Sequence, residues 1–355
     1  MPKENVSLTL QQFCEITQYI NTELFSIIPV FHPQYSKDGI ITSEVLTILK
    51  SLNTEVVIAI DRNILSDILT AVKCGSFKKC RRRKAITAFL YWVGINEFNI
   101  SPYEGIKEQA FVEFNNISGN KELELFNHFF DCIPPQAVIS SFFSEDITFC
   151  SKKYCETSDS EEFDFLSNDA DFMYLYASML HLVYEIRVGK SRIEQFKNIL
   201  HWYFQEELIS QPGLTYIVLL FVKEGIKPPH HMMDNSRVIH GCKNAAMDLY
   251  YFQEIDPRRY PSDKYTFFAA TNDGNMMEIF KNAYNPWRKQ TPEELLKKLC
   301  QYCKDKNAND YSNILLEEFH LHNYDNSVGS ATFHFKRASE LCAQEEKRLV
   351  QLIKA

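Results

Sequence analysis

Acidic, amide and hydroxyl side chains follow two apolar segments that are far apart in the sequence. Asp61 and Asn63 come after Val-Val-Ile-Ala-Ile, and Thr271 and Asp273 come after Tyr-Thr-Phe-Phe-Ala-Ala. Segments of this kind are typical of buried strands in parallel sheets, whose carboxyl ends line the crevice where ligands bind. One Asp at such a position is also a good N-cap for the next helix. Two matching strand ends favour a common site.

The segment that begins at Ser101 predicts a helix with two further carboxylates. Ser101 is the expected N-cap, Pro102 the first helical residue and Glu104 the capping-box partner. Glu108 lies one turn beyond Glu104 without a capping role, and Gly105 on the same face permits close approach of backbone or substrate. We therefore expect Glu108 to belong to the site, with Glu104 as the alternative.

A third acid lies on a helix predicted near 238–255, where Asn244 and Asp248 share a face and border the apolar stripe. A carboxylate that faces a core needs a partner, and a metal ion is one. Mg²⁺ and Mn²⁺ prefer carboxylate oxygens and can activate water for hydrolysis. The predicted metal ligands, also the predicted catalytic residues, are Asp61, Glu108, Asp248 and Asp273. The residues predicted to orient them are Asn63, Asn244 and Thr271.

A dense basic segment follows the first predicted strand. Residues 73–84 contain seven Lys and Arg and no acid, in a protein of formal net charge −8. The acidic total argues against a nucleic-acid partner, but a local cluster of cations is what phosphate contact needs. The alternative is a solvated loop. The residues predicted to contact nucleic acid are Lys78, Lys79, Arg81, Arg82, Arg83 and Lys84.

Helices must supply most of the framework for these side chains. The 355 residues include only 11 Gly and 13 Pro, which indicates long helices and few tight turns. The first residues lack a signal-peptide pattern, and the longest apolar segment, 214–222, is too short to span a bilayer. Ten scattered cysteines suit a reducing compartment. We expect a cytoplasmic protein without membrane association.

The order of these motifs resembles that of the PIN-like nuclease family. The resemblance rests on an Asp-x-Asn at a strand end, a Pro-initiated helix with a Glu, an Asn-Ala-Ala-x-Asp-Leu helix, and a later Thr-x-Asp. In this sequence they are Asp61 and Asn63, Pro102 and Glu108, Asn244 to Leu249, and Thr271 and Asp273. The resemblance implies an α/β fold with a small parallel sheet between helical layers. It also implies acids clustered around Mg²⁺ or Mn²⁺ that hydrolyse phosphodiester bonds, mostly in RNA.

The cores of this family are compact, so much of this sequence would lie outside such a core. Glu108 and Asp248 are 140 residues apart, so a helical insertion must separate them. The expected organisation is an N-terminal helical extension (1–50), a nuclease core in two parts (51–135 and 236–290), a helical insertion (136–235) and a C-terminal helical extension (291–355). The insertion offers a surface for a protein partner.

The function expected from the sequence is that of a metal-dependent ribonuclease, with RNA preferred to DNA as substrate. Two alternatives stay open. One is an adaptor that keeps the fold and binds partners without catalysis. The other is a phosphohydrolase with Asp61 as covalent nucleophile, although that chemistry usually has a second Asp where this protein has Asn63.

Overall fold

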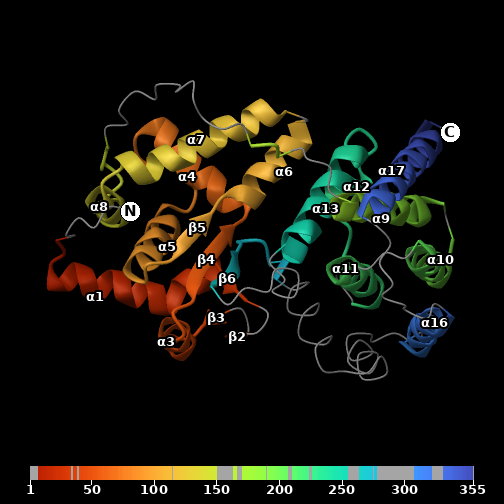
Figure 1. Cartoon of the computed structure of the whole chain (residues 1–355), viewed down its shortest axis with the longest axis horizontal. Coiled ribbons are helices and arrows are strands. Elements are labelled where there is room, and N and C mark those ends of the chain that lie inside the picture. The colour runs from red at the N-terminus through yellow and green to blue at the C-terminus, as the bar shows by residue number, and fades with distance from the viewer. Residues whose placement is uncertain are drawn as a thin grey trace. The chain divides into compact units, whose positions relative to one another are not determined.

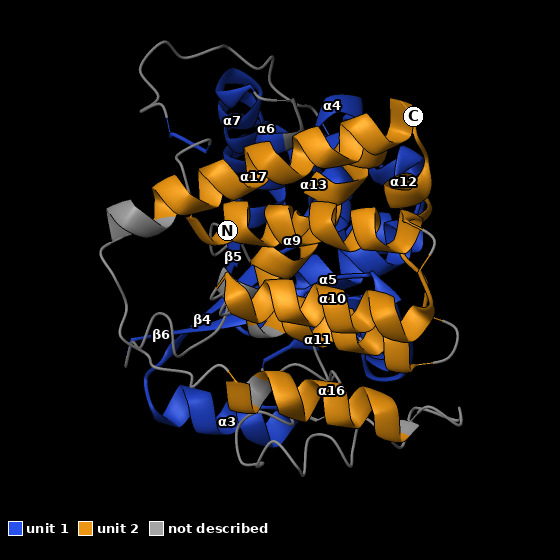
Figure 2. Ribbon diagram, turned by 90° about the vertical axis from the view of Figure 1, so that its right-hand side faces the viewer, with its two compact units in different colours: residues 1–167, 255–277 blue, residues 168–254, 278–355 orange. Residues whose placement is uncertain are grey.

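The computed structural model is helix-rich and contains a four-stranded and a two-stranded sheet (Figure 1). It describes residues 7–32, 35–37, 40–113, 115–149, 163–165, 170–188, 190–206, 210–223, 226–254, 264–274, 276–277, 308–321 and 331–354. The protein divides into two compact units (Figure 2). Unit 1 is Met1–Ser167 with Ile255–Met277, and unit 2 is Asn168–Glu254 with Glu278–Ala355.

The four-stranded sheet of unit 1 has the order β1-β6-β4-β5. β4 (Glu55–Ile60) pairs in parallel with β6 (Tyr265–Ala270) and with β5 (Asn99–Ser101). The two strands predicted from the sequence are confirmed as parallel neighbours. The sheet is mixed rather than all-parallel, because the short β1 (Val30–Phe31) joins β6 in the antiparallel direction. A separate hairpin pairs β2 (Ser36–Lys37) with β3 (Ile40–Ile41).

Helices surround this sheet in unit 1. Their bounds are α1 (Leu10–Tyr19), the π-helical η1 (Ile20–Leu24), α2 (Phe25–Ile27), α3 (Ser43–Ser51), α4 (Arg62–Cys74), the 3₁₀ turn η2 (Phe77–Lys79), α5 (Arg83–Ile95), α6 (Tyr103–Glu113), α7 (Asn116–Cys132) and α8 (Pro135–Phe143).

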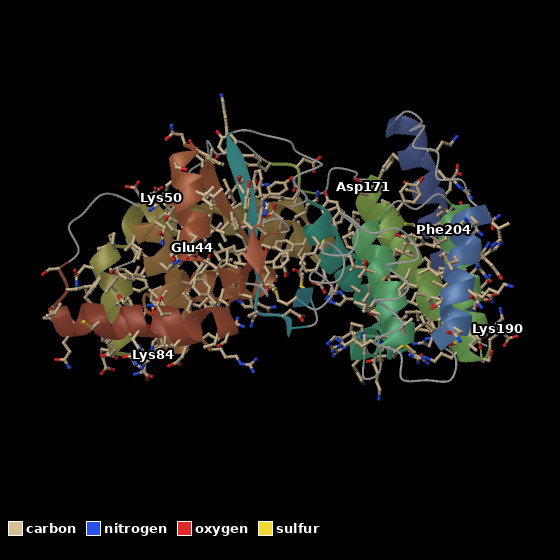
Figure 3. The ribbon with its side chains drawn as sticks, turned by 90° about the horizontal axis from the view of Figure 1, so that it is seen from below. Glu44, Lys50, Lys84, Asp171, Lys190 and Phe204 are labelled. Carbon is tan, nitrogen blue, oxygen red and sulfur yellow. The ribbon has the colours of Figure 1, made fainter. Side chains whose placement is uncertain are left out.

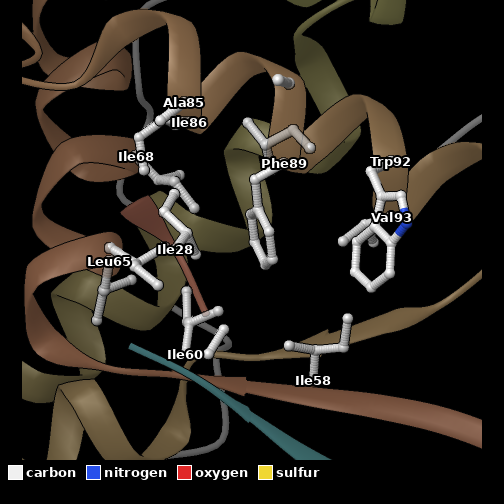
Figure 4. Close-up of a cluster of buried hydrophobic side chains, with 14 of the residues drawn as sticks. Ile28, Ile58, Ile60, Leu65, Ile68, Ala85, Ile86, Phe89, Trp92 and Val93 are labelled. Atoms are coloured by element: carbon white, nitrogen blue, oxygen red, sulfur yellow. The ribbon is translucent and has the colours of Figure 1, made fainter. Parts of the chain in front are cut away.

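The hydrophobic core of unit 1 lies between one face of the sheet and helices α4 and α5 (Figure 4). Ile58 and Ile60 are two residues apart on β4 and therefore lie on the same face of the strand, where both point toward Phe89 of α5. Ile16 of α1 and Phe142 of α8 belong to the same buried cluster. The segments predicted as an N-terminal extension and as the start of an insertion therefore share the core of the sheet.

The helices described in unit 2 are α9 (Ala170–Arg187), α10 (Arg192–Gln205), α11 (Gln211–Val222), α12 (His230–Met233), α13 (Val238–Glu254), α16 (Ala308–Leu321) and α17 (Ala331–Lys354). Helix α9 packs against α10, α13 and α17, and α10 also packs against α16 (Figure 2).

Helix α13 was predicted to belong with the sheet as part of the nuclease core (236–290), but its contacts assign it to unit 2. No helix in the described part of the protein is long and apolar enough to cross a membrane.

Candidate functional site

Asp61 lies at the carboxyl end of β4 and begins α4 as its N-cap. Its Oδ1 accepts a hydrogen bond from the backbone N–H of Ile64 at 2.8 Å. Its Oδ2 accepts from the hydroxyl of Thr271 at 2.6 Å and from the N–H of Asn272 at 3.3 Å. Only 6% of Asp61 is exposed. The pKa of Asp61 is raised overall, because the effect of burial is larger than the opposing effects of these three hydrogen bonds and of the charge of Arg82.

Thr271 and Asp273 follow the neighbouring strand β6. Because β4 and β6 run in register to Ile60 and Ala270, the strands end at the same edge of the sheet. The fully buried hydroxyl of Thr271 donates to Asp61 and accepts from the N–H of Asp273 at 3.0 Å. Asp273 Oδ1 caps the next helical turn by accepting from the N–H of Met276 at 3.2 Å. The two strand ends predicted to share a site are therefore hydrogen-bonded to each other.

Glu108 lies on α6 within electrostatic range of the Asp61 carboxylate. Burial raises the pKa of Glu108 to about 7, with the charge of Asp61 acting in the same direction and the charge of Arg62 in the opposite one. Oε2 of Glu104 accepts a hydrogen bond from the hydroxyl of Ser101 at 3.3 Å, a contact between two side chains rather than the backbone contacts of the predicted capping box, and α6 begins at Tyr103 rather than at Pro102. Glu108 is therefore an acid whose pKa responds to the charge of Asp61.

Asp248 and Asn244 lie on α13 and belong to unit 2. The pKa of Tyr216 on α11 is raised by burial, by the charge of Asp248 and by Cys242, which places Asp248 near the Tyr216 hydroxyl. The Nδ2 of Asn244 lies 3.5 Å from the Nε2 of His240. Of the four predicted metal ligands, Asp61, Glu108 and Asp273 therefore belong to unit 1.

Two arginines of the basic segment form contacts within unit 1. Arg82 donates from Nε to Oδ2 of Asp67 at 3.0 Å and from Nη2 to the carbonyl of Asn63 at 3.1 Å. Arg83 donates from Nη1 to the carbonyl of Phe142 at 3.0 Å. These two arginines therefore anchor the segment to α4 and α8.

The other four predicted nucleic-acid contacts have exposed side chains, as does Asn63 at the start of α4. The exposed cations of the predicted set are Lys78, Lys79, Arg81 and Lys84. Lys78 lies 3.7 Å from the exposed Asp146, and the Nζ of Lys84 lies over the ring of Phe142. Lys84 is labelled in Figure 3.

The described residues contain no group of three His, Cys, Asp or Glu side chains arranged to hold a metal ion. The oxygen donors at the strand ends nevertheless suit Mg²⁺, which is usually bound by one or two carboxylates with waters completing the octahedron. Asn272 adds an oxygen of this kind: its Oδ1 is buried and has no hydrogen-bond partner within the described structure. A buried polar atom without a hydrogen-bond partner lowers the stability of the folded protein, and an ion or a water molecule is a usual partner for such an atom.

Three residues at this edge were not predicted as site residues: Arg62, Glu122 and Asn272. Arg62 and Glu122 form an ion pair between α4 and α7. The sequence held no local signal for this pair, because its partners are 60 residues apart; Glu122 does end a Gly-x-Lys-Glu segment (119–122) like the one at 105–108 that ends in Glu108. Asn272 lies between two residues that were predicted, and only the hydrogen bond from its N–H to Asp61 distinguishes it.

Comparisons with known proteins identify no relative: no family model, no curated protein and no solved structure matches this sequence. The resemblance to PIN-like nucleases therefore stays a prediction from short motifs.

Proposed function

We propose that this protein is a divalent-metal-dependent nuclease whose reaction centre is the sheet edge of unit 1. The observation that carries the proposal is the pair of carboxyl groups of Asp61 and Glu108. Burial raises the pKa of each, and the charge of Asp61 raises that of Glu108 further. A divalent cation bound between two such carboxyl groups would favour their ionised forms.

Each residue at the edge has a role in the proposal. Asp61 and Glu108 hold Mg²⁺ or Mn²⁺ directly, and Asp273 holds it through water. Thr271 fixes the Asp61 carboxylate through the 2.6 Å hydrogen bond, and Asn272 offers its buried Oδ1 as a further oxygen. The bound ion supplies an activated water and neutralises charge that develops on the phosphate. The proposed reaction is hydrolysis of phosphodiester bonds, with RNA preferred to DNA.

The exposed cations of the basic segment provide the proposed contact with the phosphate backbone. Lys79, Arg81 and Lys84 are exposed on or beside the segment that links α4 to α5. Contacts of this kind depend on salt and ignore base sequence. Replacing Lys79 and Arg81 by Gln is expected to weaken RNA binding and flatten its salt dependence. Lys50→Gln on α3 is a matched control (Figure 3).

The deciding experiment measures cleavage of single-stranded RNA and DNA with Mg²⁺ or Mn²⁺, and with EDTA. Asp61→Asn and Glu108→Gln are each expected to lower the rate by at least about 100-fold, because each removes a proposed ligand. Glu44→Gln, an exposed acid on α3, is expected to leave the rate unchanged (Figure 3). Cleavage that persists in EDTA or in Asp61→Asn would contradict the proposal.

Asn63 favours this reaction over covalent phosphoryl transfer. A phosphohydrolase with Asp61 as nucleophile usually has a second Asp two residues on, and this protein has Asn63 there. The Oδ1 of Asp61 accepts one hydrogen bond, from the N–H of Ile64, and so keeps a lone pair that a metal ion could use.

A further inference from the structure

Arg62 and Glu122 form a two-point ion pair. Nη2 of Arg62 donates to Oε1 of Glu122 at 2.8 Å, and Nη1 donates to Oε2. The side chains are 22% and 13% exposed. Two parallel hydrogen bonds between a guanidinium and a carboxylate fix the plane and position of the guanidinium. The Arg62 charge is therefore held in one place.

A glycine brings Glu108 to the start of α4. A Cβ added at Gly105 would lie 3.2 Å from the backbone nitrogen and 3.3 Å from the Cα of Arg62. A side chain at this position would require α4 to move by a few tenths of an ångström, so glycine favours the close approach of α6 to α4. Glu108 follows Gly105 by three residues and so lies on the same face of α6. Arg62 is also within electrostatic range of Glu108.

A second glycine brings α7 close to α6. A Cβ added at Gly119 of α7 would lie 2.8 Å from Cδ2 of Phe165, and 3.3 Å from Cγ2 of Ile106 and 3.4 Å from Cβ of Ala110, both on α6. Glu122 follows Gly119 by three residues, just as Glu108 follows Gly105. Both glutamates interact with Arg62, Glu122 through the ion pair and Glu108 through the charge of the guanidinium.

The Arg62 guanidinium poses a problem for a metal ion bound at Glu108. If Arg62 paired directly with Glu108, it would occupy oxygens that a cation needs. We infer that Glu122 is a positioning residue that binds the Arg62 guanidinium and so keeps the carboxylate of Glu108 open to a divalent cation. The inference rests on the proposed metal site and assigns a role to two residues that are not themselves ligands.

The inference is tested by the affinity of the full-length protein for Mn²⁺, measured from the EPR signal of free Mn²⁺ without nucleic acid. In Glu122→Gln, Arg62 is released and competes with the metal, so Mn²⁺ binding is expected to weaken about tenfold. Arg62→Gln removes the competitor and is not expected to weaken binding. The double variant is expected to return to within about threefold of the wild-type affinity, because competitor and holder are both absent.

A merely structural ion pair would give a different pattern. Removing either partner would then weaken Mn²⁺ binding similarly, and the double variant would show no recovery; this result would overturn the inference. Glu122→Asp, which keeps the carboxylate, is expected to bind Mn²⁺ with an affinity between those of wild type and Glu122→Gln, and it replaces Glu122→Gln if that variant does not fold. Asp131→Asn, an exposed acid on α7, serves as the control and is expected to bind as wild type does.

The wild type and Asp61→Asn separate failure of this inference from failure of the proposed function. If the wild type binds no Mn²⁺, or if Asp61→Asn binds it equally well, the metal site and the inference are both overturned. If Asp61→Asn loses binding while Glu122→Gln keeps the wild-type affinity, only the positioning role of Glu122 is overturned.

Discussion

Asp61 combines two tasks that are usually treated as alternatives. Its Oδ1 caps α4 through Ile64, and its Oδ2 joins the end of β4 to the end of β6 through Thr271. The structural contacts hold the carboxylate in one orientation, which is also what a metal ligand needs. The capping interpretation and the site interpretation of this residue therefore do not exclude each other.

The raised pKa of Glu108 predicts how stability depends on pH in the metal-free protein. The pKa rises from an ordinary value of 4.5 to about 7 on folding. Between these values the folded protein keeps a proton that the unfolded protein has lost, so the contribution of Glu108 to stability is complete below about pH 4.5 and is lost as the pH rises through about 7.

The variant Glu108→Gln has no ionisable group at this position, so it does not lose this contribution to stability as the pH rises. The free energy of unfolding of this variant minus that of wild type is expected to be about 2 kcal/mol higher at pH 8 than at pH 5. Urea unfolding in EDTA at the two pH values measures the difference. The same relative stability at both pH values would contradict a raised pKa.

At the scale of elements, close approach between helices depends on glycine. A Cβ added at Gly241 of α13 would lie 2.5 Å from the carbonyl carbon of His231, and 2.6 Å from the carbonyl oxygen of His231 and from the backbone nitrogen of Met232. These are backbone atoms of α12, which cannot rotate away as the atoms of a flexible side group do. A larger residue at this position must therefore displace α12.

Gly241→Ala is expected to lower the free energy of unfolding by about 2 kcal/mol, because overpacking exceeds the gain of about 1 kcal/mol in helix propensity. Gly274→Ala is the control, since its Cβ would meet nothing within 4 Å, and a change within about 0.5 kcal/mol is expected. Chemical denaturation of both variants makes the comparison. Equal free energies of unfolding for the two variants would contradict the prediction, because they would show that α12 moves aside without an energetic cost.

At the scale of the molecule, each unit is assembled from two separate stretches of sequence. Unit 1 takes β6 from Ile255–Met277, although the rest of it ends at Ser167. β6 is the only described strand that pairs with both β1 and β4, and its Phe268 and Ala270 belong to the core. Unit 1 therefore depends on residues that follow a large part of unit 2 in the sequence.

Two truncations test this dependence. A protein that ends at residue 307 lacks α16 and α17 of unit 2, and its β4 amides are expected to stay protected from hydrogen exchange. A protein that ends at residue 254 also lacks β6, and its β4 amides are expected to exchange at least about 100-fold faster, because the strand loses a neighbour and part of its core. Equal protection in the two truncated proteins would contradict the assignment of β6 to unit 1.

The sequence alone determined where the main local elements of unit 1 lie. Continuous apolar segments predicted β4 and β6, because strand burial depends on residues that are close together in the sequence. The Ser101–Pro102–Glu104 pattern predicted a helix at this position, although α6 begins at Tyr103, one residue later than expected. It also identified Asp61, Thr271 and Asp273 as residues at neighbouring strand ends, since parallel pairing brings these ends to one edge.

Only the tertiary structure decided which distant segments meet. The antiparallel β1, the ion pair of Arg62 with Glu122, and the membership of Asp248 in unit 2 all depend on contacts between residues far apart in the sequence. The strength of these contacts depends on burial and on the distance between charges, and neither is fixed by local spacing. The same holds for the basic segment. Its composition predicted a cationic surface, but only the structure distinguished Arg82 and Arg83, which bind other parts of unit 1, from the exposed Lys79 and Arg81.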